Sequence, residues 1–465
     1  MNALELLLER DIHPSQLAFF ELGTRPVSYG ELLDSARRAQ KSLRGLGFSE
    51  SSSILLADSI SADFYAVVMA ALGLGGKVIL VEPFLPVREI EQVISVCRPS
   101  VFVASFLGRA WGARVSAIRD IPHWKSSKSL CNETGMVRDF CVSDLPPETP
   151  GIITFTTGTS TGRSKGVVRT HQGLTAQNRA IRTSAELELF RGPDLAIFAN
   201  LTLANLGMGR GTVFIPPGWK AKHFKQLADL PKELKPETLS CGPTFLKILL
   251  SRNSVPETLR SVHVGGALTE CSLFESAFDA LPESRFIHVY GSSEAEPVAF
   301  VDAKESVRKS KERGFVHALL AGNIVPGLMT RMDDRTLWVS GDHVCGEYLG
   351  NAEENLRSKE KDPNGRLWHA MGDRMVKNED GLWYQGRSFQ DPDDFLLEQK
   401  IYRVLGHTKA FVFRDKQNLP VLSGESLKTR SGELLRKFPQ ISRVQEKKII
   451  RDRRHRARID RGASQ

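Results

Sequence analysis

The amino-acid sequence predicts an α/β protein with a parallel sheet and more than one domain. A strand over 53–56, an apolar helix over 62–72 and a second strand over 77–81 follow one another in the order of a βαβ unit. Of the 465 residues, 41% are hydrophobic and 25% are charged, which is the composition of a globular protein. A chain of this length buries a large core and is expected to divide into domains.

The sequence contains no signal for membrane insertion, secretion or structural metal binding. No apolar run reaches the roughly 18 residues of a membrane-spanning helix, so we predict no membrane span. The N-terminus is acidic and amphipathic, unlike a secretory signal peptide. Six cysteines lie far apart without a Cys-x-x-Cys pair. This spacing disfavours a zinc site or a disulfide scaffold and predicts reduced thiols in a cytoplasmic protein.

Positive charge is concentrated near the C-terminus. The formal net charge is +9, and Lys and Arg outnumber Asp and Glu by six between Arg443 and Arg461. A basic tail is typical of proteins that bind nucleic acid or an anionic surface, so nucleic-acid binding through this tail stays open as a remote alternative. The remainder of the chain is close to neutral, which disfavours nucleic acid as the partner.

Local signals define the other elements in order. Ser28 and Glu31 form a capping box for a helix whose apolar residues continue to Leu46, and Gly47 stands where that helix would end. The stretch 121–148 is polar and poorly periodic, so we interpret it as a connector.

Farther along, 195–199 is a strand candidate. Near the C-terminus we expect a helix over 397–405 and strands over 410–413 and 420–422.

The segment 154–166 (Thr-Phe-Thr-Thr-Gly-Thr-Ser-Thr-Gly-Arg-Ser-Lys-Gly) combines hydroxyls, glycines and one lysine. Glycines let the backbone approach a polyphosphate, hydroxyl and N–H groups donate to its oxygens, and Lys165 supplies a compact positive charge. The spacing differs from the Walker pattern, in which Ser or Thr follows the lysine. A flexible surface loop is the alternative interpretation.

Three segments resemble motifs of the adenylate-forming superfamily, which includes acyl-CoA synthetases, fatty acyl-AMP ligases, peptide-synthetase adenylation domains and luciferases. The segment 154–166 is similar to the phosphate-binding loop, which usually ends Pro-Lys-Gly where this chain has Ser164. The segment 290–294, Tyr-Gly-Ser-Ser-Glu, is similar to the family's Tyr-Gly-x-Thr-Glu. Trp-His-Ala-Met-Gly-Asp at 368–373 is closest to the β-lactone synthetases of olefin biosynthesis.

The resemblance implies a site for ATP and Mg²⁺. Tyr290 would face adenine, Ser293 would bond the α-phosphate, and Glu294 would hold Mg²⁺. Asp373 would accept hydrogen bonds from both ribose hydroxyls, and Arg387 would contact the ribose and the phosphates. The implied nucleotide-binding residues are Thr156, Thr157, Gly158, Thr159, Ser160, Thr161, Gly162, Lys165, Gly266, Ala267, Tyr290, Gly291, Ser292, Ser293, Asp373 and Arg387; the implied catalytic residues are Lys165, Ser293, Glu294 and Arg458.

Local pattern alone offers plainer interpretations of two of these segments. A strand that ends in a polar turn would explain 290–294, and a surface Asp-Gly hairpin would explain 380–387. In relatives the segments 205–213 and 241–245 border the acyl pocket, although the first also fits a glycine-tolerant turn beside a buried helix.

The resemblance also implies an architecture. A large multi-subdomain N-terminal body of parallel and mixed sheets with helices, over 1–386, would be followed by a small mobile α+β lid over 387–465. The match weakens after Arg387, where 78 residues remain. In this region Arg458 stands where the family has its catalytic lysine, and the two side chains are not interchangeable. An altered active-site segment and a solvated basic tail therefore both stay open.

The implied reaction joins a carboxylic acid, fatty or hydroxy-fatty, to ATP and gives an acyl-adenylate and pyrophosphate. The acyl group would then pass to CoA, to the thiol of an acyl-carrier protein, or to the substrate's own β-hydroxyl to close a lactone. A nucleotide-binding relative with impaired catalysis is the main alternative, because Arg458 replaces the lysine and the C-terminal region is short.

Overall fold

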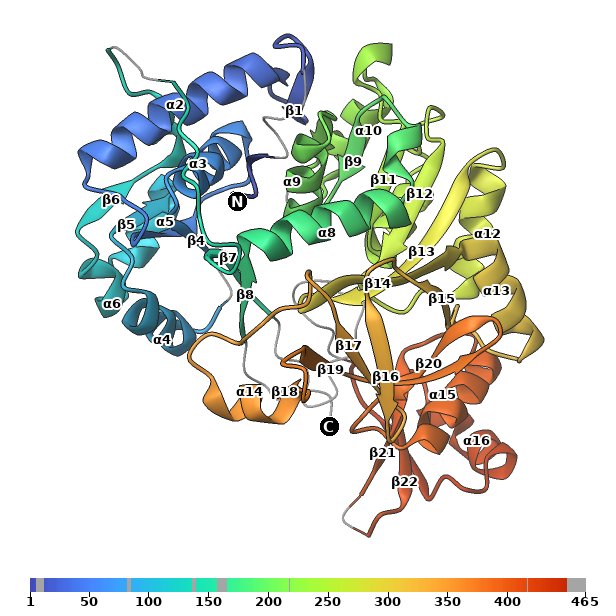
Figure 1. Ribbon diagram of the computed structural model, residues 1–465. Helices are drawn as coiled ribbons and strands as arrows, with labels where there is room; N and C mark the ends of the chain where they lie inside the picture. The colour runs from blue at the N-terminus through green and yellow to red at the C-terminus, as the bar shows by residue number, and fades with distance from the viewer. Residues whose placement is uncertain are drawn as a thin grey trace.

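The computed structural model describes residues 1–5, 12–81, 85–135, 139–156, 165–216, 218–415 and 417–449. Within these ranges the strands form a 14-stranded, a six-stranded and a three-stranded sheet, with helices on their faces (Figure 1). The predicted α/β fold class, with a large body followed by a small C-terminal unit, is confirmed. No helix in the described ranges combines the length and apolar character needed to cross a membrane.

The six-stranded sheet contains the predicted βαβ unit. β3 pairs in parallel with β4, and the buried helix α3 connects them. The strands, in spatial order, are β6 (His123–Lys125), β5 (Val101–Ala104), β3 (Ser53–Ala57), β4 (Lys77–Leu80), β7 (Pro150–Phe155) and β8 (Gly166–Thr170). The helices of this part are α2 (Tyr29–Gly45), α3 (Ala62–Gly73), α4 (Val87–Cys97), α5 (Phe106–Gly112), α6 (Ser116–Arg119) and α7 (Ser127–Cys131).

Helix α2 begins and ends where its capping residues predict. The Ser28 side chain accepts a hydrogen bond from the Glu31 N–H, and the Glu31 side chain accepts one from the Ser28 N–H. The helix ends before Gly47, whose φ of 76° lies in the left-handed region. The connector interpretation of 121–148 is wrong in part, because β6 and α7 lie within it. They are only three and five residues long, too short to give a periodic signal.

The large sheet is mixed. Neighbouring strands pair in parallel from β13 through β12, β11, β9 and β10 to β1. The pairs β13–β14, β14–β15 and β16–β17 are antiparallel. The spatial order is β16 (Met329–Asp333), β17 (Thr336–Ser340), β19 (Leu367–Asn378), β20 (Gly381–Arg387), β15 (Leu320–Ile324), β14 (Ala295–Asp302), β13 (Arg285–Ser292), β12 (Ser261–Gly265), β11 (Thr238–Cys241), β9 (Asp194–Ala196), β10 (Thr212–Phe214), β1 (Leu17–Glu21) and β2 (Val27–Ser28), and β18 (Lys359–Lys361) pairs with β19.

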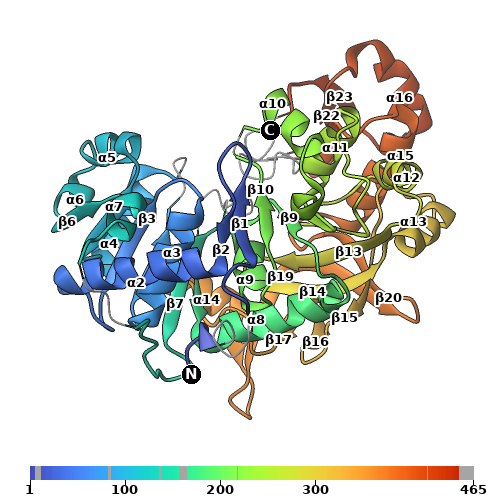
Figure 2. The same cartoon turned by 90° about the horizontal axis from the view of Figure 1, so that it is seen from above.

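Helices cover this sheet and separate it from the six-stranded one. Figures 1 and 2 both show α8 lying beside β14, between the two sheets. The helices are α8 (His171–Ser184), α9 (Ala199–Gly207), α10 (Ala221–Ala228), α11 (Pro243–Ser251), α12 (Cys271–Ala280), α13 (Ala303–Glu312) and α14 (Ala352–Ser358), with short 3₁₀ helices at η1 (Leu187–Leu189) and η2 (Lys232–Leu234).

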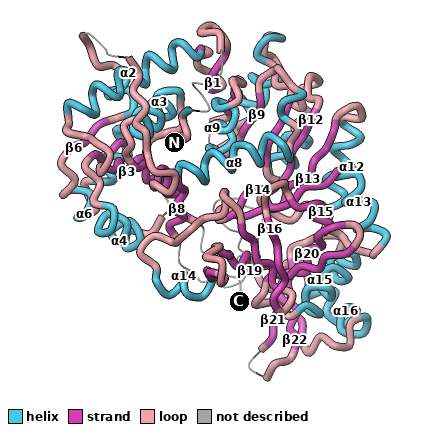
Figure 3. Tube along the Cα trace, viewed as in Figure 1, coloured by secondary structure: helices cyan, strands magenta, loops and turns pink. Residues whose placement is uncertain are grey.

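The C-terminal unit is a three-stranded sheet with helices (Figure 3). It comprises α15 (Pro392–Leu405), β21 (Ala410–Arg414), β22 (Pro420–Gly424), η3 (Lys428–Arg430), α16 (Ser431–Lys437) and β23 (Arg443–Glu446). The predicted helix and both predicted strands are present, although α15 begins five residues earlier than the prediction. The unit has its own core, but Phe395 of α15 packs with Leu320 and Trp383 of the body. The basic segment 450–465 lies outside the described residues.

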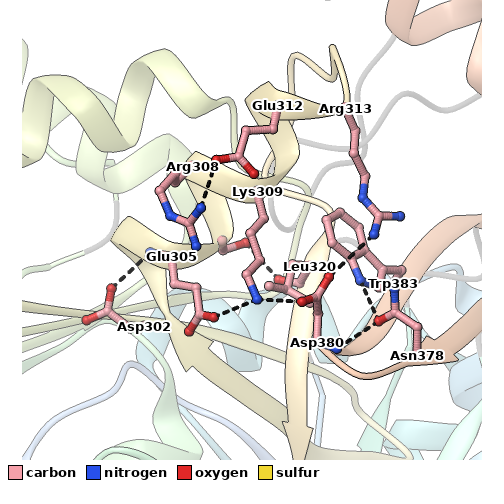
Figure 4. A network of polar contacts seen from close by, with 11 residues as sticks. Asp302, Glu305, Arg308, Lys309, Glu312, Arg313, Leu320, Asn378, Asp380 and Trp383 are labelled. Carbon is pink, nitrogen blue, oxygen red and sulfur yellow. Dashed lines mark hydrogen bonds and ion pairs between the residues drawn. The ribbon is translucent and has the colours of Figure 1, made fainter.

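A polar network fixes the β19–β20 hairpin against α13 (Figure 4). Asp380 in the turn pairs with Lys309 of α13 at 2.5 Å and with Arg313 at 3.4 Å. Trp383 donates to Asn378 at 3.1 Å, and the Arg313 guanidinium lies 3.8 Å from the centre of the Trp383 ring. The predicted Asp-Gly hairpin therefore exists, and it also holds β20 in place as that strand leads to Arg387.

Two glycines allow β15 and β20 to approach closely. Gly381 has a φ of 112°, which favours glycine, and a Cβ at this position would lie against the Gly322 carbonyl oxygen, closer than atoms can pack. Gly365 also has a positive φ of 76°, but a Cβ there would meet no atom within 4 Å.

We therefore expect Gly381→Ala to lower the free energy of unfolding by about 1–3 kcal/mol more than Gly365→Ala. Both substitutions strain a left-handed backbone, but only the first also forces two strands apart. Urea denaturation of the two variants would measure the difference. An equal loss of stability in both would contradict the proposed backbone contact.

Candidate functional site

The predicted phosphate loop connects two antiparallel strands, β7 and β8. At its base the Thr156 N–H donates to the Lys165 carbonyl at 3.0 Å, and the Lys165 N–H donates to Thr156 Oγ1 at 3.2 Å. The chain then continues as strand β8 and helix α8. The predicted binding residues Thr157, Gly158, Thr159, Ser160, Thr161 and Gly162 lie outside the described residues.

A cavity of about 520 Å³ opens at the base of this loop and brings both sequence motifs together. Thr156 and Lys165 from the loop and Ser292, Ser293 and Glu294 from the β13–β14 turn all line it. These motifs are more than a hundred residues apart in the chain, and the two sheets bring them to one place. We name this space the phosphate cavity.

The Lys165 side chain is held by residues that the sequence motifs did not indicate. Its Nζ forms an ion pair with Glu354 Oε1 at 2.5 Å, and both side chains are about nine-tenths buried. Glu354 lies in the first turn of α14, where its N–H donates to the Asn351 side chain. Arg357, one turn later, also donates to Glu354 at 2.9 Å. The lysine ammonium is thus already fixed beside the cavity.

Glu294 is ionised in this environment. Burial opposes the charge, but hydrogen bonds from the Tyr348 and Ser292 side chains lower the pKa of the Glu294 carboxyl below its usual range. The Tyr348 hydroxyl donates to Glu294 Oε1 at 2.7 Å. The structure therefore presents a carboxylate oxygen to the cavity at neutral pH.

Ser293 and Arg169 connect the turn to the loop strands. Arg169 of β8 donates to the Ser293 carbonyl at 2.7 Å and to Thr154 Oγ1 at 2.5 Å. This guanidinium therefore bridges β7 and the β13–β14 turn, which fixes Ser293 at the cavity wall.

The three predicted nucleotide residues Tyr290, Asp373 and Arg387 lie in mutual contact. The Tyr290 hydroxyl donates to Asp373 Oδ2 at 2.7 Å, and Arg387 Nη1 lies 2.8 Å from Asp373 Oδ1. Asp373 and Arg387 are paired residues in the β19–β20 ladder. The Asp373 carboxylate raises the pKa of Arg387. Burial, and to a lesser extent the same carboxylate, raises the pKa of Tyr290. The buried Asp373 carboxylate is thus held by the Arg387 guanidinium and the Tyr290 hydroxyl.

These residues line a second cavity of about 1110 Å³, which we name the nucleotide cavity. Gly266, Ala267 and Gly291, which the resemblance also assigns to the nucleotide site, line it as well. Gly266 has a φ of 83°, so glycine is favoured there, and the absent side chain leaves room for a flat ring.

A third cavity of about 430 Å³ is mostly apolar, and we name it the acyl cavity. Side chains from α3, α8 and α9 line it, including Phe64, Met69 and Leu203. The segment 242–245 also contributes, as do Leu206 and Gly207 at the end of α9. The first part of the segment 205–213 is thus both part of a buried helix and a wall of the cavity.

The three cavities share lining residues. The acyl and phosphate cavities have Asn200, Ser293 and Glu296 in common, the phosphate and nucleotide cavities share Gly291 and Arg387, and Gly266 lines all three. A molecule with a polar centre, a flat ring on one side and an apolar chain on the other fits this arrangement.

The site suits a cation only together with a ligand that supplies oxygens. No cluster of three His, Cys, Asp or Glu residues that could hold a metal occurs in the described part of the chain. Mg²⁺ is usually bound through one or two carboxylates plus substrate phosphates. The ionised Glu294 beside Lys165 in the phosphate cavity fits that pattern.

Sequence reasoning missed Tyr348, Glu354 and Arg169. Each contacts a predicted residue across a large sequence separation, and no local motif marks that contact. The last predicted catalytic residue, Arg458, lies outside the described residues.

Comparison with known proteins agrees with this geometry. The model of the "AMP-binding enzyme" family matches residues 10–348. The olefin beta-lactone synthetase of Stenotrophomonas maltophilia is 24% identical over 369 residues, which cover 71% of this chain and 66% of that protein. Indigoidine synthase of Dickeya dadantii is 26% identical over 269 residues, which cover 53% of this chain and 18% of that protein.

The solved structures that resemble the chain share its fold. ATP-bound MatB from Rhodopseudomonas palustris superposes with a TM-score of 0.80 at 16% identity, covering 100% of this chain and 98% of MatB. By contrast, the chain spans no more than 66% of the two curated relatives named above. The family model matches most of the chain, and it includes the loop and turn motifs on which the predicted resemblance rests. The chain therefore belongs to the AMP-binding enzyme family.

Proposed function

We propose that the protein activates a carboxylic acid with ATP, giving an acyl-adenylate and pyrophosphate. The observation that carries this proposal is the meeting of the three cavities at Gly266, with Ser293 between the acyl and phosphate cavities. The reaction needs the acid carboxylate beside the α-phosphate, and only a junction of an apolar and a polar cavity places them together.

The proposed roles combine the resemblance with the positions of the described side chains. The nucleoside would occupy the nucleotide cavity, with adenine on Tyr290 and the ribose hydroxyls on Asp373. Lys165 and the hydroxyl-rich loop would neutralise the phosphates. Ser293 lies where the α-phosphate and the carboxylate would react.

Glu294 is the residue that would hold Mg²⁺. The bound ion would neutralise phosphate charge as pyrophosphate leaves. Arg387, which lines both the nucleotide and the phosphate cavity, would help orient the α-phosphate. Arg458 is proposed for the position of the family lysine on sequence alone.

The apolar walls of the acyl cavity support a fatty or hydroxy-fatty acid. Phe64, Met69 and Leu203 would pack on the chain and favour it by burying apolar surface. CoA, an acyl-carrier protein and an internal β-hydroxyl all remain acceptors for the second step. The similarity to an olefin beta-lactone synthetase supports the hydroxyl, whereas that to a probable CoA ligase of Humulus lupulus supports CoA.

The proposal is tested by measuring pyrophosphate release with a panel of acids, with and without CoA. Release that depends on a fatty or hydroxy-fatty acid is expected. If the protein binds ATP but releases no pyrophosphate under any condition, the alternative is favoured, namely a nucleotide-binding relative with impaired catalysis. A salt-dependent shift of DNA or RNA would favour the remote alternative of nucleic-acid binding.

We expect Lys165→Ala and Glu294→Ala each to reduce ATP–pyrophosphate exchange by about a hundredfold or more, because Lys165 would stabilise the reacting phosphates directly and Glu294 would hold the cation that does so. Lys311→Ala is the matched control, since it breaks an exposed ion pair with Glu275 outside the three cavities. Exchange rates like those of the parent in both site variants would remove these residues from the site.

We expect Asp373→Ala to weaken AMP binding by about 1.5–3 kcal/mol, the usual contribution of hydrogen bonds to a charged acceptor. Asp34→Ala is the matched control, because it removes an ion-paired aspartate of α2 that lines none of the three cavities. Titration calorimetry gives both dissociation constants. An unchanged constant for Asp373→Ala would place the ribose elsewhere.

A further inference from the structure

Tyr348 lies between the two charged groups of the phosphate cavity. Its side chain is buried, and its hydroxyl donates to Glu294 Oε1 at 2.7 Å. The Lys165 ammonium lies 5.0 Å from the centre of its ring, within the range of a cation–π contact. One side chain therefore contacts both the proposed cation ligand and the proposed phosphate-binding lysine.

The backbone of Tyr348 is fixed from two directions. Its N–H donates to Asn355 Oδ1 at 2.7 Å, and the Asn355 side chain donates back to the Tyr348 carbonyl at 3.0 Å. Tyr348 also forms an antiparallel bridge with Val167 in β8, the strand that follows the phosphate loop. Helix α14 and strand β8 together determine where the ring lies.

A second lysine adds to the charge on this ring. The Lys359 ammonium lies 5.1 Å from the ring centre and donates to the Cys345 carbonyl. The His369 ring packs edge-on at 6.2 Å between centroids. Together with the Glu354–Lys165 pair, these groups surround the Tyr348 ring, and the Tyr348 hydroxyl donates to the Glu294 carboxylate.

We propose that Tyr348 is a positioning residue, which aligns Glu294 and Lys165 on one metal–phosphate unit. The hydroxyl engages one oxygen of the Glu294 carboxylate, so the other oxygen can ligate the cation. The ring also contacts the Lys165 ammonium, which Glu354 holds at the wall of the same cavity. This inference rests on the proposed ATP and Mg²⁺ site.

The two contacts of Tyr348 can be separated by substitution. Tyr348→Phe removes the hydroxyl and keeps the ring, whereas Tyr348→Leu removes both. The readout is ATP affinity by titration calorimetry, with Mg²⁺ and with a chelator. Tyr348→Phe should reduce the affinity gained from Mg²⁺ by about tenfold and leave Mg²⁺-free ATP binding within about twofold. Tyr348→Leu should weaken Mg²⁺-free binding as well.

Tyr29→Phe is the matched control. The Tyr29 hydroxyl is also buried and donates to the Leu206 carbonyl at 3.1 Å, but the residue lines none of the three cavities. It should leave ATP affinity unchanged in both conditions. In a Glu294→Gln background, Tyr348→Phe should have little further effect, because the two residues act through one contact.

Each outcome decides a different point. A parent protein without Mg²⁺-dependent ATP binding would refute the proposed site itself. If the parent gains ATP affinity from Mg²⁺ and the Tyr348→Phe variant gains as much, this inference alone is overturned. Equal losses with and without Mg²⁺, or failure of Tyr348→Phe to fold, would assign the hydroxyl a structural role and also overturn it.

Discussion

A single buried carboxylate connects the strands that form the nucleotide side of the site. Asp373 lies in β19, and its two partners, Tyr290 and Arg387, lie in β13 and β20. A charge at this depth is tolerable only while it is paired, because desolvation without a partner costs several kcal/mol. The register of β19 and β20 and the position of β13 are therefore coupled, since a shift in either would separate the pair.

The phosphate side follows a different design, in which charges are arranged before any ligand arrives. Lys165 is paired with Glu354, and Glu294 is held ionised by its neighbours although it is buried. The Glu294 carboxylate therefore needs little rearrangement to receive a cation. Binding of a polyphosphate would compete with Glu354 for the lysine, so part of the binding energy would be used to break that pair.

Local signals were sufficient for several elements. The Ser28–Glu31 capping box predicted the start of α2, and the alternation of apolar segments predicted the parallel β3–β4 pair. The two sequence motifs also predicted residues that the fold brings into shared cavities. These predictions succeeded because each depends on neighbours within a few residues or on a recognisable motif.

The remaining contacts could not be predicted from sequence. Lys165 and Glu354 are 189 residues apart, and Tyr348 and Glu294 are 54 apart, with no pattern that links either pair. The short elements β6 and α7 were missed because three to five residues complete no period. Tertiary packing, rather than local preference, determines these parts.

Phe395 has a consequence for the energetics of domain movement. Its ring packs edge-on against Tyr384 of β20 with 5.5 Å between centroids, while Leu397 and Ile401 of the same helix belong to the core of the C-terminal unit. Helix α15 thus has one end in each hydrophobic core. A rotation about 388–391 that separated these two cores would expose the Phe395 ring, whose burial is worth about 1.5–3 kcal/mol, so this contact opposes such a rotation.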